Sequence, residues 1–198
     1  MKIQDCVNQA YQNAVSKGFY ERATKATERF QLMLSEVAEA TEEFRSSKDD
    51  FYMIGEKPEG QSIELIDVLI RIFDYSGYCG IDLANLINQR FFVEFKKIET
   101  LSDLMNAVSD LNNIKCYQEL ENVNDDLEYQ LSVSISIAMA GKSYLDGKDE
   151  GTIFLHLSDT VVKIARIFYL KQWDIEKLLS IKHAYNVNRP HKHGGKVC

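Results

Sequence analysis

Residues 62–78 read Ser-Ile-Glu-Leu-Ile-Asp-Val-Leu-Ile-Arg-Ile-Phe-Asp-Tyr-Ser-Gly-Tyr, an apolar run with a charged residue at every third or fourth position. Glu64, Asp67, Arg71 and Asp74 therefore share one face if the run is a helix. Because apolar residues fill nearly all other positions, we expect this helix to be buried, with its carboxylates inside or beside the core. A buried carboxylate without a partner is costly and shifts its pKa.

Apolar residues recur at helical spacing on both sides of this run. We expect helices over 3–17, 24–45, 62–78, 101–116, 125–145 and 154–170, and two more that begin after the N-caps Asp82 and Asp174. The stretch 46–60 is expected to be a loop, because it holds Pro58 and two glycines. With 198 residues, 45% of them hydrophobic, and only 2 prolines, the chain is predicted to be an all-α bundle.

A second pair of acids precedes the central helix. Glu36 and Glu39 lie three residues apart in Ser35-Glu-Val-Ala-Glu39, so they share one face of the helix over 24–45. If that helix packs antiparallel to the helix over 62–78, four carboxylates converge with Glu64 and Asp67 and repel one another. Something positive must then lie between them.

Few cations fit that position. Arg71 lies one turn beyond Asp67 and can serve one acid, not four. A divalent ion satisfies all four, and an all-oxygen ligand set suits Mg²⁺, with Mn²⁺ as a substitute. The competing interpretation is that these acids are ordinary solvated charges on helix faces. Asp74 lies one turn further on. Three roles stay open for it: a further metal ligand, a group that contacts the sugar, and a partner of Arg71.

The second half of the chain repeats the plan of the first. A displacement of 92 residues places Asp67 on Asp159 and Asp82 on Asp174, and a displacement of 99 places Glu36 on Ile135. We therefore predict two repeated helical units, 1–98 and 99–198, that form an internal pseudo-dimer. The second unit keeps only one acid of the four, so we expect one complete acidic site per chain.

Charge and cysteine pattern exclude several classes of function. The net charge of −7 disfavours nucleic-acid binding, which needs a basic stripe. Four scattered cysteines without a CxxC pair argue against a zinc site. We find neither a membrane-length apolar run nor a secretory signal, and we expect a cytoplasmic protein without a membrane partner. The basic segment 189–196 is too short to hold a duplex but suits the phosphates of one nucleotide.

The acidic motifs and this basic segment together resemble the MazG-like, all-α nucleoside triphosphate pyrophosphohydrolases. The resemblance rests on Leu32-Met-Leu-Ser-Glu-Val-Ala-Glu-Ala40, on Ile63-Glu-Leu-Ile-Asp67 and on Lys182-His-Ala-Tyr-Asn-Val-Asn-Arg-Pro-His-Lys-His-Gly-Gly-Lys196. A single-unit member has this closing motif directly after its first unit, whereas here it follows the second unit. The chain thus looks like two fused units, similar in plan to the dimeric dUTPases, and the tail can act in its own chain or in a neighbour's.

The resemblance implies an enzyme that cleaves a nucleoside triphosphate to a monophosphate and pyrophosphate. Glu36, Glu39, Glu64 and Asp67 would hold Mg²⁺, and Glu36 or Glu39 would be the general base. The implied substrate-binding residues are Arg71, Asp74, Lys182, Tyr185, Asn186, Arg189, Lys192 and Lys196. Candidates for stacking on the base are Phe19, Tyr20, Phe30 and Trp173.

Two other functions remain open on the sequence. One is a non-catalytic nucleotide-binding or regulatory bundle, and the other is a purely structural helical protein. The resemblance to this family also implies a homodimer. No motif indicates which base or sugar is preferred.

Overall fold

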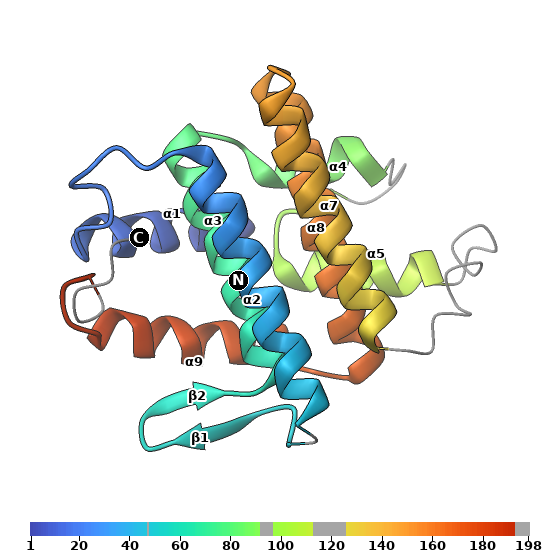
Figure 1. Cartoon of the computed structure of the whole chain (residues 1–198). Helices are drawn as coiled ribbons and strands as arrows, with labels where there is room; N and C mark the ends of the chain where they lie inside the picture. The colour runs from blue at the N-terminus through green and yellow to red at the C-terminus, as the bar shows by residue number, and fades with distance from the viewer. Residues whose placement is uncertain (47, 92–96, 113–125, 193–198) are drawn as a thin grey trace.

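The computed structural model describes residues 1–46, 48–91, 97–112 and 126–192. Within these residues the chain is an all-α bundle with one small hairpin, as predicted (Figure 1). The helices are α1 (Ile3–Ser16), α2 (Ala26–Arg45), α3 (Gln61–Cys79), α4 (Leu83–Phe91), α5 (Leu101–Asn112), α7 (Asp126–Leu145), α8 (Glu150–Lys171) and α9 (Ile175–Asn188). None of these helices is long and apolar enough to cross a bilayer.

The helices pack in two hairpins, α2 against α3 and α7 against α8, and the hairpins pack on each other through α2 and α7 and through α3 and α8. Figure 1 shows α2 and α7 side by side, with α3 and α8 behind them. The shorter helices α1 and α9 both pack on α3, whereas α4 and α5 pack on α8. The two ends of the described chain therefore meet on the same central helix.

Helix α3 is buried along almost its whole length, as its apolar composition predicted. Its apolar side chains, among them Ile66, Leu69 and Phe73, are fully inaccessible to solvent. The helix begins after Gly60 and ends at Gly80, whose φ of 67° is the left-handed C-cap conformation that glycine adopts without strain. Because α3 is enclosed by α1, α2, α8 and α9, its charged residues have to find partners inside the protein.

The expected loop over 46–60 contains an antiparallel hairpin, so that prediction was wrong in part. Strands β1 (Tyr52–Ile54) and β2 (Lys57–Glu59) pair with Ile54 opposite Lys57. The two-residue turn begins at Gly55, which has the positive φ that such a tight turn needs. Because glycine and proline mark turns of either kind, their presence did not distinguish a hairpin from an irregular loop.

The predicted duplication has counterparts in the helix boundaries. Helices α2 and α7 end 100 residues apart, at Arg45 and Leu145. The left-handed C-caps Gly80 and Gln172 are 92 residues apart, as are the N-caps Asp82 and Asp174 that precede α4 and α9. These boundaries favour a displacement of 100 residues, not 99, between α2 and α7. With this displacement, Glu36 corresponds to Ser136. These correspondences support the internal pseudo-dimer, which stays a prediction.

Candidate functional site

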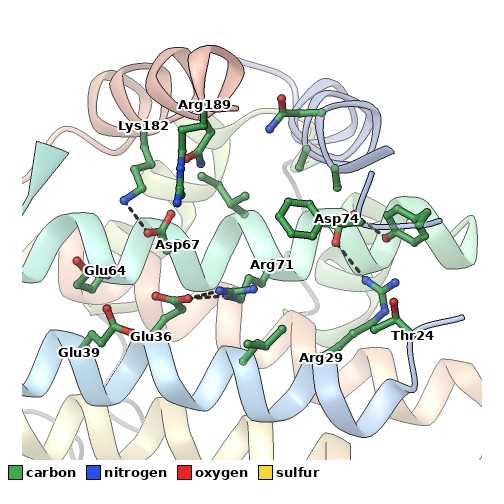
Figure 2. Close-up of a pocket in the computed structure, with 18 of the residues that line it drawn as sticks. Thr24, Arg29, Glu36, Glu39, Glu64, Asp67, Arg71, Asp74, Lys182 and Arg189 are labelled. Atoms are coloured by element: carbon green, nitrogen blue, oxygen red, sulfur yellow. Dashed lines mark hydrogen bonds and ion pairs between the residues drawn. The ribbon is translucent and has the colours of Figure 1, made fainter. Parts of the chain in front are cut away.

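A cavity of about 200 Å³ lies between α1, α2, α3 and α9. Figure 2 shows that one end gathers carboxylates from α2 and α3 beneath basic side chains from the α9 end. The other end holds Arg29 and Asp74 (Figure 2). The lining residues are Ala10, Asn13, Ala14, Phe19, Tyr20, Thr24, Arg29, Leu32, Glu36, Glu39, Lys57, Glu64, Asp67, Ile70, Arg71, Asp74, Lys182, Asn186 and Arg189.

Three of the four predicted acids meet at one point. Carboxylate oxygens of Glu36, Glu64 and Asp67 lie within 4.8 Å of one another, and Glu36 and Glu64 are buried. Glu39 lines the same cavity but is more exposed and stays outside this group. The spacing of the two pairs therefore predicted the convergence, but the fourth acid lies at the rim.

Two cationic side chains already contact the acidic group. The guanidinium of Arg71 donates to Glu36, with an Nε–Oε1 distance of 2.7 Å. The ammonium of Lys182, which is almost fully buried, lies 2.7 Å from Asp67. Arg71 serves one acid, as its position in the sequence suggested. Lys182 brings a second cation from α9, far away in the sequence.

Glu64 is the acid without such a partner: in the described chain it forms neither an ion pair nor a side-chain hydrogen bond. Burial, with the neighbouring Asp67 carboxylate second, raises the pKa of Glu64 to about 8. Burial also raises the pKa of Asp67, although Lys182 opposes that shift. At neutral pH the site therefore has room for more positive charge than Arg71 and Lys182 supply.

Asp74 does not belong to the acidic group. Its carboxylate accepts a hydrogen bond from the hydroxyl of Tyr20 at 2.6 Å and lies 3.1 Å from the guanidinium of Arg29. Of the three roles left open by the sequence, Asp74 therefore has Arg29 and not Arg71 as its cation and lies outside the group of three carboxylates, while a contact with the sugar stays a prediction. Asp74 remains a cavity-lining group at the end away from the acids. Burial and the nearby carboxylate raise the pKa of Tyr20, so its hydroxyl stays a donor.

Arg29 is a residue of the site that sequence reasoning missed. Its guanidinium lies about 5 Å from the ring centres of Tyr20, Tyr75 and Tyr78, and its side chain is buried. A signal was present in the sequence, because Arg29 occupies the same face of α2 as the buried Met33. Asn13, Thr24 and Lys57 also line the cavity, but no motif distinguished them from ordinary surface residues.

Only some of the substrate-binding residues that were predicted in and after α9 line the cavity. Lys182, Asn186 and Arg189 line it, and the Oδ1 atom of the buried Asn186 has no hydrogen-bond partner in the described protein. Tyr185 is not a lining residue, but its ring lies 5.6 Å from the guanidinium carbon of Arg189 and supports that side chain. Lys192 points elsewhere and pairs with Glu21 at 2.7 Å. Lys196 lies outside the described residues.

The end of α9 is held against the connection that follows α1. The ammonium of Lys17 donates to the backbone oxygens of Val187 and Arg189, both at 2.6 Å, and the backbone N–H of Lys192 donates to the oxygen of Lys17. Close packing continues at Gly18, where an added Cβ would overlap the ring of His191. The basic segment thus lies against its own chain as far as Lys192, and its Arg189 lines the cavity of that chain.

Two of the four aromatic candidates line the cavity. Both lie in the connection between α1 and α2, Phe19 directly before Tyr20, and Tyr20 contacts Asp74 at the end away from the acids. Phe30 is buried in the core, and Trp173 packs edge-on against Phe168 and donates to Asp50. The stacking role predicted for Phe30 and Trp173 is therefore wrong, because helical spacing does not distinguish core aromatics from cavity aromatics.

The second hairpin has no comparable acidic group among the described residues. At the position that corresponds to the first site, Asp159 accepts a hydrogen bond from Ser136 at 2.7 Å and pairs with Lys163 at 3.0 Å. His156, one turn before Asp159 on α8, is not among the partners of Asp159 found in the described chain. Lys163 and, at 3.9 Å, Arg90 balance this single acid, so no surplus negative charge is left there.

Comparison of the chain with protein-family models, with curated proteins and with solved structures finds no match. The candidate function therefore rests on the geometry of the cavity and on the residues that line it.

Proposed function

We propose that this protein is a metal-dependent nucleoside triphosphate pyrophosphohydrolase, which cleaves the bond between the α and β phosphates. The observation that carries the proposal is the cavity itself, in which three convergent carboxylates lie beside the basic side chains of Lys57, Lys182 and Arg189. A site with both charges is suited to a ligand that combines a cation with a polyphosphate. The cytoplasm, which supplies both, is the compartment we propose.

The acidic group has the donors that Mg²⁺ or Mn²⁺ prefers. Glu36, Glu64 and Asp67 offer only carboxylate oxygens, and Glu64 has no cationic partner among the described residues while burial and the Asp67 carboxylate raise its pKa. Glu39 is close enough along α2 to contribute from the rim. A bound divalent cation would neutralise charge on the phosphate oxygens and make water a stronger nucleophile.

The remaining side chains suit the two ends of a nucleotide. Lys57, Lys182 and Arg189 are proposed to bind the triphosphate, where the guanidinium of Arg189 offers two parallel donors and each lysine a point charge. Tyr20, at the other end of the cavity, and the lining residue Phe19 beside it in the sequence are proposed to flank the nucleoside. This orientation puts the α phosphorus near the carboxylates and the base away from them.

Glu39 is the better candidate for general base. Water attacks the α phosphorus, the bond to the bridging oxygen breaks, and pyrophosphate leaves with the electron pair of that bond. A carboxylate must take the proton of the water. Glu36 is engaged by Arg71, whereas Glu39 is more exposed and makes no hydrogen bond or ion pair with the described residues. We therefore assign the proton transfer to Glu39.

One observation favours a second candidate, a non-catalytic nucleotide-binding bundle. Arg71 and Lys182 already balance two of the three acids, so the cluster has internal counter-ions. A protein that only binds nucleotides would need the basic side chains and the cavity, but not a metal or a free carboxylate.

The test is a hydrolysis assay over the eight common ribo- and deoxyribonucleoside triphosphates and dUTP, with Mg²⁺ and with EDTA. We expect pyrophosphate and a monophosphate from at least one of them, only with the metal. Glu39→Gln should lower kcat by about 10² to 10⁴ fold, the usual contribution of a general base. Glu42→Gln, an exposed residue of the same helix, is the matched control. Nucleotide binding without turnover in any reaction would favour the second candidate.

A further inference from the structure

Helix α7 exposes a row of apolar side chains on the face turned away from the core. Leu131, Ile135 and Met139 are 60%, 53% and 45% exposed, and Ala138 lies exposed among them. The opposite face of the helix packs against α8 and α2 through buried residues such as Val133 and Ile137. In Figure 1, α7 lies at the surface in front of α8. Exposed apolar rows of this kind mark interaction surfaces.

Helix α2 shows that the fold does not require apolar residues on this face. With the displacement of 100 residues, Leu131 and Ile135 correspond to Gln31 and Ser35. Gln31 is exposed like Leu131, and Ser35 is partly exposed. The two helices thus have a similar pattern of burial, but only α7 carries large apolar side chains at these positions; the exposed large apolar side chain of α2, Phe44, lies in its last turn. A specific partner for α7 explains this difference.

The row is self-complementary about Ile135. Positions seven apart lie nearly above one another on a helix of about 3.6 residues per turn. Glu128 and Lys142 lie seven residues before and after Ile135, both are exposed, and they therefore frame the row at its two ends. Leu131 and Met139 lie four residues on either side of Ile135. A copy of the helix that runs antiparallel brings each residue opposite a suitable partner.

We propose that α7 pairs with α7 of a second copy of this chain about a two-fold axis at Ile135. In this arrangement Leu131 of each copy faces Met139 of the other, and Glu128 faces Lys142 at both ends. A two-fold interface requires one surface patch that fits itself. Opposite charges at the two ends fix the antiparallel direction, because a parallel pair would bring like charges together. Lys142 gives up only an exposed pair with Asp146, the residue that follows the helix.

The proposal is tested by sedimentation equilibrium from low to high micromolar concentration. The wild-type chain should approach twice its mass of 22.7 kDa. The double variant Leu131→Gln, Ile135→Ser should weaken association by about 100-fold and keep its helical circular dichroism, because α2 already carries these residues at the corresponding positions. Ile54→Thr, at a residue that is 61% exposed on the hairpin, is the matched control and should dimerise normally.

A charge exchange tests the direction of the pair. Glu128→Lys and Lys142→Glu should each weaken the dimer by about tenfold, and the variant that carries both changes should recover it. A wild-type chain that stays monomeric overturns the proposal, even if this face then binds lipid vesicles. A dimer that survives Leu131→Gln, Ile135→Ser also overturns it, and so does a charge exchange without recovery.

Discussion

Replacing Glu64 by glutamine should change how the stability of the metal-free protein depends on pH. Burial raises the pKa of Glu64 from an ordinary 4.5 to about 8 in the folded protein. Between these two values the unfolded chain has lost the proton that the folded chain retains. The unfolded state therefore binds fewer protons, and stability falls as the pH rises from 4.5 to 8.

The magnitude follows from the same two values. Each pH unit in this window costs about 1.4 kcal/mol, so the ionised carboxylate lowers the free energy of unfolding by up to about 5 kcal/mol above pH 8. A buried glutamine has a desolvation cost of its own, about 1–3 kcal/mol, at every pH. We therefore expect Glu64→Gln to be similar to wild type or slightly less stable at pH 5, and about 2–4 kcal/mol more stable at pH 9.

Urea unfolding followed by circular dichroism, with EDTA at pH 5 and at pH 9, measures both values. Glu42→Gln, whose side chain is mostly exposed, should give the same difference from wild type at both pH values. Mg²⁺ at pH 9 should stabilise wild type by about 3 kcal/mol at a hundred times its Kd, and Glu64→Gln by less. A difference between Glu64→Gln and wild type that does not change with pH would refute the reasoning.

Three further changes test other parts of the site. Lys182→Met removes the ammonium beside Asp67 and leaves a buried charge unpaired. It should therefore lower the free energy of unfolding by about 2–4 kcal/mol at neutral pH. Addition of Mg²⁺ should recover part of this loss in the same urea unfolding assay. Lys17→Met should speed amide hydrogen exchange over 187–192, measured by mass spectrometry, and raise the KM for the nucleotide more than it lowers kcat. Arg29→Met should cost about 3 kcal/mol in thermal or urea unfolding, because it leaves a buried carboxylate without its cation; a loss below about 1 kcal/mol would contradict that account.

Local patterns predicted the helices well. The apolar run that contains Glu64 is a buried helix, and the N-caps Asp82 and Asp174 are where the sequence placed them. These features depend on interactions within one or two turns, so neighbouring residues suffice to specify them. The hairpin over Tyr52–Ile54 and Lys57–Glu59 escaped prediction because strands this short carry no periodic pattern.

The acidic site was predicted only in part. The paired spacing of Glu36, Glu39, Glu64 and Asp67 indicates which carboxylates can share a face, and three of them do meet. Spacing could not indicate that Glu39 stays at the rim, nor that Asp74 pairs with Arg29. Those outcomes depend on the rotation and offset of α2 against α3, which packing of the whole core sets.

The sequence determines which helices form, which of their faces are apolar, and that four carboxylates lie on two neighbouring helix faces, because these properties repeat along a single chain segment. It does not determine which cations face those carboxylates. Lys182 reaches Asp67 across 115 residues of chain, and Lys17 holds the end of α9 from the other end of the molecule. Such contacts form only when α1 and α9 pack on α3, since charge attraction acts between groups that the fold has already brought together.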